Sequence, residues 1–255
     1  MNSTRGLLEI HERSLSSMPR ILTLSALSFF VCMLSSPPLS AQVALFSGLS
    51  FEHEVTRSYG YEVQIENRQI VGTGEKNRML LIGALNFSLA DNLDVTPAVR
   101  LIPSYGSDDP TELRLQLDLN YSYPLGDGPF ALEGRLRNQY ERDIAEGAHG
   151  HKYAVRPRLG LAYSVFEHTE LVVEYEARYR FDTRNEFVRH RYTLGFSQEV
   201  TTRIKISGFY RIEQRINIGP VDPDPFIGVY FNYVLPDARK RDWRYRRPFG
   251  RSLNW

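Results

Sequence analysis

The sequence predicts an all-β protein, namely an up-and-down antiparallel transmembrane β-barrel of about ten strands, with twelve strands as the alternative. Three observations support this fold class. Polar and apolar residues alternate over many segments, short and long connections alternate between those segments, and an N-terminal targeting segment precedes them. Such a combination is typical of barrels that cross the bacterial outer membrane.

Residues 1–41 have the layout of a secretory signal peptide, with Met18 as the expected start. A single basic residue is followed by an apolar run, two prolines and a small-residue end at 39–41. The apolar run is shorter than the roughly 20 residues that a spanning helix needs, so we expect cleavage and a mature N-terminus near Gln42. The only cysteine, Cys32, lies inside this segment, so the mature chain would have neither a disulfide nor a thiol nucleophile.

The segment ELRLQLDLNYSY at 112–123 shows the alternation most clearly. Every odd position is leucine or tyrosine, and every even position is charged or polar. A helix would scatter these leucines around its circumference, whereas a strand places them on one face. Long, evenly spaced strands of this kind indicate an up-and-down antiparallel sheet. Further strands are expected at 61–70, 78–90, 93–102, 130–143, 152–165, 170–181, 188–200, 203–216 and 226–235.

The connections between these strands alternate in length. Short ones are expected at 90–92, 124–129, 166–169 and 201–202. Longer ones, rich in Gly, Asp and Pro, are expected at 72–77, 104–111, 144–151, 182–186 and 219–225. Outer-membrane barrels keep short turns on the periplasmic side and longer loops outside the cell, so this rhythm also predicts the orientation of the chain.

A soluble β-sandwich would also alternate, but the length of the predicted strands favours a membrane, and the cost of burying charge in lipid then fixes which face points outward. The predicted strands are longer than the 5–6 residues typical of soluble sheets, whereas a tilted strand needs about 9–11 residues to cross a bilayer. An arginine at the bilayer midplane of a barrel costs about 2–4 kcal/mol, so the many charged side chains must face the lumen and the apolar ones the lipid.

The expected domains follow from these boundaries. Residues 59–235 form the barrel, whose even strand number would leave both ends in the periplasm. The preceding segment, 42–58, is strand-like and has three candidate places: the barrel seam, the periplasm, or a twelve-stranded barrel. Residues 236–255 form a basic tail, expected to be periplasmic and either disordered or weakly amphipathic. Two prolines inside predicted strands, Pro97 and Pro157, suggest bulges, because each removes a ladder donor.

The lumen-facing charges are the main candidate site. Acids and arginines on neighbouring strands lie about 5 Å apart, within reach of charge-assisted hydrogen bonds. They would form either a structural plug of paired charges or a selective path for a small anionic or zwitterionic solute. We expect the plug, because acids and bases are nearly balanced and ten strands leave little room. The ladder comprises Arg114, Asp118, Glu133, Arg135, Arg137, Glu141, Arg156, Arg158, Glu174, Glu176, Arg178, Arg180, Arg189 and Arg191.

Enzyme chemistry is the third alternative, and its candidates lie in predicted outer loops. They are His149 and His151 with Glu146, and the acids Asp108, Asp109 and Asp182. No third metal ligand and no serine–histidine–acid set is assured by spacing, so we expect no catalytic residue, metal or cofactor. The loop acids Asp108, Asp109, Asp222 and Asp224 are expected to be solvated turn residues rather than cation ligands.

The runs RLRNQYERD, KYAVRPRLGLAYSV and RHRYTLGFSQEVTTRIKISGFYRIEQR resemble the bacterial outer-membrane barrels catalogued as domain of unknown function 2490, over about residues 59–235. This resemblance implies an outer-membrane barrel and supplies no established activity. Separately, FIGVYFNY at 226–233 is similar to the last-strand signal that the outer-membrane assembly machinery reads. Gly228, Phe231 and Tyr233 occupy the matching places.

The sequence thus predicts a porin-like protein of a Gram-negative outer membrane, with a charge-filled, sealed lumen and a structural or interaction role at its outer loops. Expected partners are outer-membrane lipid, lipopolysaccharide and the barrel assembly machinery, and a small solute if the lumen conducts. The 31 basic and 30 acidic residues give no reason to expect nucleic acid.

Overall fold

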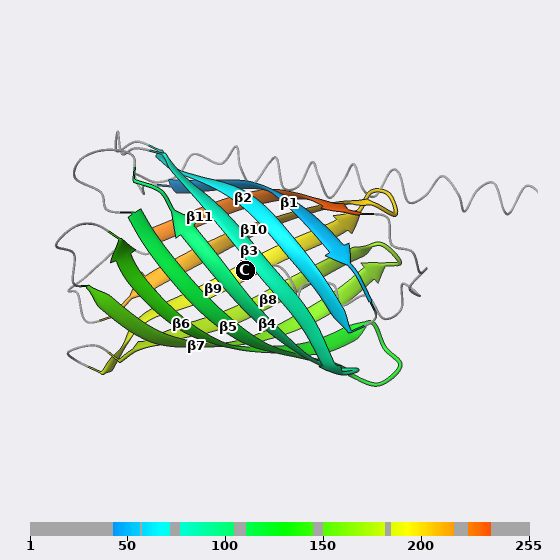
Figure 1. The fold of residues 1–255 in the computed structure, drawn as a ribbon. Helices are drawn as coiled ribbons and strands as arrows, with labels where there is room; N and C mark the ends of the chain where they lie inside the picture. Colours follow the sequence, from blue (N-terminus) through cyan, green and yellow to red (C-terminus); the bar gives the residue numbers. More distant parts are fainter. Residues whose placement is uncertain are drawn as a thin grey trace, which may run out of the picture. The chain divides into compact units, whose positions relative to one another are not determined.

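The protein is an eleven-stranded closed barrel (Figure 1). The computed structural model describes residues 43–56, 58–71, 77–104, 111–144, 150–181, 185–216 and 224–235, so the expected signal peptide and basic tail lie outside the described residues. Within the described part, no helix is long and apolar enough to cross a membrane. The strands are β1 (Val43–Glu54), β2 (Tyr59–Val71), β3 (Arg78–Ala90), β4 (Leu93–Ile102), β5 (Thr111–Pro124), β6 (Phe130–Ile144), β7 (His151–Phe166), β8 (Thr169–Arg180), β9 (Glu186–Glu199), β10 (Ile204–Arg215) and β11 (Asp224–Val234).

The predicted fold class is confirmed. Consecutive strands pair antiparallel from β1 to β11, as an up-and-down barrel requires. Five longer connections (72–77, 103–110, 145–150, 181–185 and 216–223) join the strands at one end of the barrel, called here the long-loop end. Five shorter ones (55–58, 91–92, 125–129, 167–168 and 200–203) join them at the other, the short-turn end. The alternating rhythm of the sequence therefore corresponds to the two ends of the barrel.

The strand-like segment whose place the sequence left open closes the seam. Its strand, β1, pairs antiparallel with β2 and parallel with β11, from Ala44↔Phe226 to Glu52↔Val234. The strand number is therefore eleven, close to the expected ten. Because an odd number of strands makes the first and last strands parallel, β1 begins at the long-loop end and β11 finishes at the short-turn end. The expectation that both barrel ends lie on one side is wrong for the described strands.

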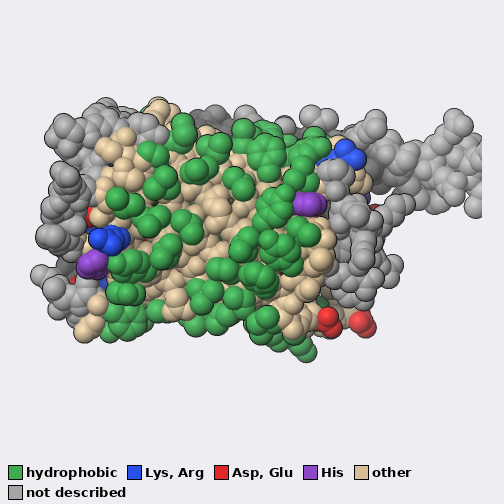
Figure 2. All heavy atoms as spheres, viewed as in Figure 1, with side chains coloured by type: hydrophobic (Ala, Val, Ile, Leu, Met, Phe, Trp, Pro, Cys, Tyr) green, Lys and Arg blue, Asp and Glu red, His purple; other side chains and the backbone are tan. Residues whose placement is uncertain are grey.

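Side chains alternate across the barrel wall as the sequence predicted. In β5, Leu115 and Leu117 are 44% and 42% exposed, whereas Gln116 and Asp118 are 5% and 3% exposed. The apolar face is thus outside and the polar face is inside, the reverse of a soluble domain. Figure 2 shows hydrophobic side chains distributed over the outer wall, with few charged groups between the two ends. This surface matches the apolar band of a barrel that faces lipid.

An apolar cluster fills the lumen beside the seam. Phe209 of β10 and Tyr230 of β11 are buried and stack, with ring centroids 6.0 Å apart. Phe46 of β1 meets Phe209 edge to face at 6.1 Å. The lumen next to β1, β10 and β11 is therefore packed with rings instead of ion pairs, which the period-two reading of the sequence did not predict.

Glycines on neighbouring strands make room for these rings. A Cβ atom added to Gly228 would overlap the ring of Phe209, and one added to Gly48 would lie 2.5 Å from Cδ1 of Tyr230. On the outer wall, Phe196 covers Gly208 in the same way, with 2.5 Å to its Cε1. Each aromatic side chain thus lies over the bare backbone of the adjacent strand, and the three contacts run from β9 to β1.

The two prolines do not cause bulges. Pro97 and Pro157 keep regular register with Leu117 and Leu136 on one neighbouring strand. On the other side, β3–β4 and β7–β8 lack ladder pairs beside the proline, but the register on the two sides of each gap is the same. A missing donor therefore interrupts the ladder without adding a residue to a strand. The register shifts lie near strand ends instead, at Ser88/Ala90, Ser164/Phe166 and Arg178/Tyr179.

We predict that Gly228→Ala destabilises the barrel by about 1–3 kcal/mol, because the new methyl group overpacks against the Phe209 ring. The free energy of unfolding would be measured by denaturant titration of the refolded protein in detergent. Gly83→Ala is the matched control, since nothing lies within 4 Å of its added Cβ. Equal stability of the two variants would contradict the close packing at the seam.

Candidate functional site

The predicted charge ladder lies on five consecutive strands, β5 to β9, at positions whose side chains point into the lumen. Its central members are almost fully buried. Strand pairing brings like charges directly opposite each other at Arg135↔Arg158, Arg137↔Arg156 and Arg178↔Arg189. Since like charges in register repel, carboxylates from other rungs must separate these arginines.

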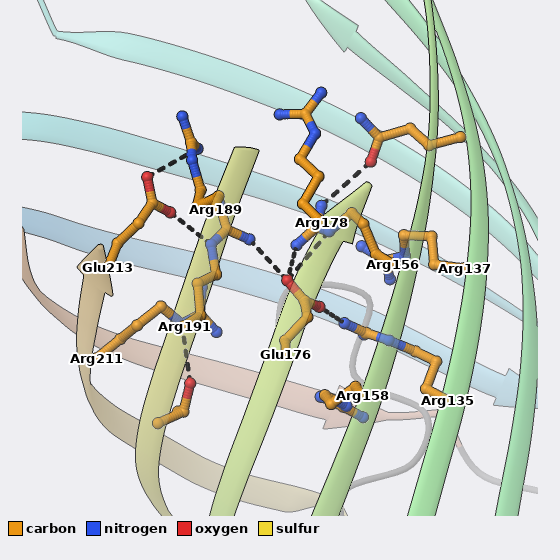
Figure 3. Close-up of polar contacts among 12 residues, drawn as sticks. Arg135, Arg137, Arg156, Arg158, Glu176, Arg178, Arg189, Arg191, Arg211 and Glu213 are labelled. Atoms are coloured by element: carbon orange, nitrogen blue, oxygen red, sulfur yellow. Dashed lines mark hydrogen bonds and ion pairs between the residues drawn. The ribbon is translucent and has the colours of Figure 1, made fainter. Parts of the chain in front are cut away.

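Glu176 of β8 is the centre of this network (Figure 3). Its carboxylate accepts hydrogen bonds from Arg135 Nη2 at 2.6 Å, from Arg156 Nη2 at 2.5 Å and from Arg191 Nη1 at 3.1 Å. These arginines come from β6, β7 and β9, so one carboxylate joins four strands. All three contacts are charge-assisted and lie in the shielded interior, where such bonds are strongest.

Two further pairs extend the network towards the short-turn end. Arg137 donates two parallel hydrogen bonds to Asp118, at 2.8 and 2.6 Å, which is the bidentate geometry of a guanidinium–carboxylate pair. Arg158 Nη1 lies 2.8 Å from Glu174 Oε1. Both pairs link neighbouring strands, β5 with β6 and β7 with β8, so they hold the wall in register as well as neutralising charge.

Other pairs extend it towards the long-loop end. Glu141 Oε1 accepts a hydrogen bond from Arg178 Nη2 at 2.8 Å and lies 3.2 Å from Arg114 Nη2. Glu213 Oε2 of β10 accepts a hydrogen bond from Arg191 Nε at 2.5 Å, and Glu213 Oε1 lies 2.8 Å from Arg189 Nη1. We call the whole set the plug network: Arg114, Asp118, Arg135, Arg137, Glu141, Arg156, Arg158, Glu174, Glu176, Arg178, Arg189, Arg191 and Glu213.

Two further predicted ladder residues, Glu133 and Arg180, also lie on the lumen side of the wall. Glu133 points into the lumen and is buried, but neither of its carboxylate oxygens has a hydrogen-bond partner among the described residues. Arg180 occupies a lumen-facing position opposite Glu186, at the end of β8. The sequence therefore predicted that both side chains face the lumen, but it did not predict which groups each of them contacts.

Sequence reasoning missed the contribution of β10. Glu213 pairs with two arginines, and Arg211 donates from Nε to Thr193 Oγ1 at 3.0 Å. The guanidinium of Arg211 also lies over the Phe209 ring, 4.6 Å from its centroid. The signal was present, because Arg211 and Glu213 share the lumen-facing parity of β10, but the aromatic and glycine residues of this strand blurred the pattern.

The opposite wall connects to the seam cluster. Glu66 of β2 forms an ion pair with Arg68 and accepts a hydrogen bond from Tyr230 OH at 2.8 Å. Arg68 in turn lies over the Phe46 ring, 4.6 Å from its centroid. Cation–π contacts and hydrogen bonds therefore connect the aromatic cluster to charged groups on both sides. Side chains from β1, β2, β10 and β11 thus form a second group of buried contacts in the lumen, beside the plug network of β5 to β10.

The outer wall carries two matching tyrosine–histidine pairs. Tyr140 OH lies 2.7 Å from His151 Nδ1, and Tyr175 OH lies 2.6 Å from His190 Nδ1, with the rings stacked in both pairs. His190 has a polar ring but occupies a position on the apolar face of β9. It faces outward, and the tyrosine hydroxyl supplies the partner that a polar ring needs on an apolar wall.

The loop candidates for catalysis or metal binding are not assembled in the described part of the chain. His151 belongs to β7 and bonds Tyr140, whereas His149, Glu146, Asp108, Asp109, Asp182 and Asp222 lie outside the described residues. Asp224 is the first residue of β11. No group of three or more metal-ligating side chains occurs among the residues that the structure describes.

The residues of the proposed assembly signal all lie on β11 but face different ways. Phe231 is exposed on the outer wall, and Tyr233 meets Phe51 of β1 edge to face at 6.4 Å. Gly228 points inward, beneath the Phe209 ring. The glycine therefore has a packing role of its own, and its reading by the assembly machinery remains a prediction.

The family model described as "Protein of unknown function (DUF2490)" matches residues 44–247, most of the chain and the whole of the barrel. The chain belongs to this family. The resemblance found in the sequence is therefore confirmed, and with it the barrel that the family implies.

A search of curated proteins finds no match. Among solved structures, the chain is similar to an anion-selective porin from Comamonas acidovorans, with 15% identity and a TM-score of 0.37. The similarity covers 72% of this chain and 54% of that porin, so this DUF2490 protein spans about half the length of the porin that it matches.

We predict that Glu176→Gln destabilises the barrel by about 3–5 kcal/mol, because it leaves three buried guanidiniums without their shared carboxylate. Glu112→Gln is the control: its carboxylate is more exposed, at 21%, and pairs with Arg114, so an effect of about 1 kcal/mol or less is expected. Denaturant titration in detergent measures both variants. A Glu176→Gln effect as small as that of the control would contradict the central role of this carboxylate.

Proposed function

We propose that this DUF2490 protein is an integral outer-membrane barrel whose lumen is sealed by its own side chains, so that it acts through its outer loops in a structural or interaction role. The observation that carries the proposal is the plug network around Glu176. It joins β6, β7, β8 and β9 by hydrogen bonds across the lumen wall, and its central side chains are buried.

The membrane location rests on the facing of the strands. The outer wall is apolar, and the arginines of the plug network all point inward. Turning even a few of them to lipid, at about 2–4 kcal/mol each, would exceed the 5–15 kcal/mol stability of an ordinary domain. Short turns then lie in the periplasm and longer loops outside, in a Gram-negative outer membrane reached after removal of the signal peptide.

Opening a path through the lumen would require the plug network to come apart. A guanidinium that loses its carboxylate in a confined, shielded space is costly, because neither water nor another carboxylate replaces the lost contacts. On the opposite side, the Phe46–Phe209–Tyr230 cluster adds packed rings that admit no hydrated ion. A narrow channel for small solutes is the alternative function, and an enzyme at the loop face is a more distant one.

The proposed partners follow from the same placement. Outer-membrane lipid and lipopolysaccharide surround the apolar wall, and the barrel assembly machinery reads β11, where Phe231 lies on the lipid-facing surface. A small solute is a partner only under the channel alternative.

We predict that the mature protein is recovered in the outer-membrane fraction, resists extraction by alkaline carbonate and migrates faster on gels before heating than after. Folded barrels keep their compact form in detergent until heated, which causes this mobility difference. Recovery in the soluble periplasmic fraction, without any heat-dependent mobility, would rule out the membrane barrel.

We predict that the purified protein is electrically silent in planar lipid bilayers and that Arg156→Ala/Arg158→Ala introduces leak. Removing these two guanidiniums opens space in the plug network and leaves Glu176 and Glu174 with fewer partners. Arg203→Ala, in the exposed turn before β10, is the control and should stay silent. Discrete, ion-selective steps in the wild type would instead support the channel.

A further inference from the structure

The lumen is charged differently at its two ends, although its total charge is nearly balanced. The midpoints of the strands separate the described lumen-facing side chains into a half nearer the long loops and a half nearer the short turns, with Arg137 at the midpoint of β6. In the half nearer the long loops, the basic residues are Arg68, Arg78, Arg100, Arg114, Lys152, Arg156, Arg158, Arg178, Arg180, Arg189, Arg191, Arg211 and Arg215. The acidic residues there are Glu66, Glu112, Glu141, Asp143, Glu176, Glu186 and Glu213.

The half nearer the short turns has the opposite character. Its acidic residues are Glu52, Glu54, Glu62, Asp94, Asp118, Glu133, Glu170, Glu174 and Glu199. Its basic residues are Arg135 and Lys205. The described lumen is therefore basic towards the long loops and acidic towards the short turns. A potential of this kind attracts anions to one end and repels them from the other.

Burial strengthens this difference at the long-loop end. The side chain of Arg189 is 25% exposed and that of Arg191 is 17% exposed, whereas their shared partner Glu213 is 3% exposed. Likewise, Arg68 is 29% exposed over a fully buried Glu66. In these pairs the guanidinium is therefore more accessible to solvent than its carboxylate, so among these described groups the arginine is the one more open to a solute.

Arg178 follows the same rule, with 14% exposure against 8% for Glu141. The Arg114–Glu112 pair is the exception, because Glu112 is the more exposed partner at 21%. We define the long-loop mouth as the surface formed by Arg68, Arg178, Arg189 and Arg191. The total numbers of acidic and basic side chains in the lumen are nearly equal, which argues against a charged opening. The charge at the mouth, however, depends on which side chains are exposed there, and not on the total numbers.

Arg178 and Arg189 have donor capacity left over. They lie directly opposite each other on β8 and β9, an arrangement of like charges that is unfavourable unless an anion lies between or beside them. Each uses terminal nitrogens for its carboxylate, and the Nε–H group of each is buried without a hydrogen-bond partner among the described groups. Two inward guanidiniums with unused donors match the fork that binds oxyanions in a bidentate way.

We propose that the long-loop mouth binds a small oxyanion of the phosphate class, held mainly by Arg178 and Arg189 with Arg191 beside them. The inference rests on the proposed function in one respect: because the plug network seals the lumen below, the anion binds at the mouth and does not pass. Free phosphate and the phosphate groups of lipopolysaccharide share this chemistry, so the experiment must separate them.

The test is a calorimetric titration of inorganic phosphate into the full mature protein in detergent, in chloride buffer of constant ionic strength. The wild type should bind, and Arg178→Gln/Arg189→Gln should bind about tenfold more weakly or worse, since tenfold corresponds to only about 1.4 kcal/mol. Arg203→Gln, at the other end of the barrel, should keep the wild-type affinity. Heat-modifiable gel mobility confirms that each variant is folded.

If the double variant does not fold, Arg189→Lys takes its place, because it keeps the charge but loses the fork and should weaken binding severalfold. A parallel titration compares lipopolysaccharide with its dephosphorylated form. Binding of the phosphorylated form alone, without binding of inorganic phosphate, would assign the site to the lipid headgroup and support the oxyanion chemistry.

Wild-type protein that binds neither phosphate source, or an Arg178→Gln/Arg189→Gln variant that binds like the wild type, would overturn the proposal. The seal is tested separately by bilayer recording. Conductance in a wild type that still binds phosphate would overturn the sealed lumen and leave the mouth site standing.

Discussion

In the proposed outer-membrane barrel, a guanidinium facing acyl chains is the state that the fold has to avoid. At about 2–4 kcal/mol each near the bilayer midplane, the arginines of β5 to β10 confine one face of every strand to the lumen. Once inside, they need carboxylates within hydrogen-bond distance, and Glu176 meets three of them at 2.5 to 3.1 Å. The alternating pattern, the pairing register and the buried network are therefore consequences of one solvation requirement.

Barrel closure depends on a different interaction. At the seam, parallel pairing of β1 with β11 places Gly48 opposite Tyr230 and Phe46 opposite Gly228. The rings of Tyr230 and Phe209 cover these glycines, so the seam is filled by apolar contact instead of by charge. Arg211 lies over Phe209 and Arg68 lies over Phe46. These cation–π contacts connect the charged side chains in the lumen to the aromatic cluster at the seam.

The proposed seal and the proposed oxyanion site use arginines that lie at different depths in the lumen. Deep arginines such as Arg135 and Arg156 are enclosed with Glu176, and in the proposed function they close the lumen. Shallower ones such as Arg189 cover their carboxylates and present guanidinium to the long-loop end. A barrel with nearly balanced charge can therefore be closed to passage and still have an opening that favours anions. This is possible because its excess basic side chains lie towards one end of the lumen and its excess acidic side chains towards the other.

The sequence by itself determined the fold class, the facing of the strands and the lumen position of the charge ladder, because a period of two combined with strand length leaves few alternatives for where an arginine can point. Only the tertiary structure decided the partners. Glu176 collects arginines from three strands, Glu133 has no hydrogen bond to its carboxylate within the described part of the chain, and β10 adds Glu213. These outcomes depend on the shear between strands, on closure by β1 as an eleventh strand and on how deeply each side chain is buried, and all three are set by contacts between residues far apart in the chain.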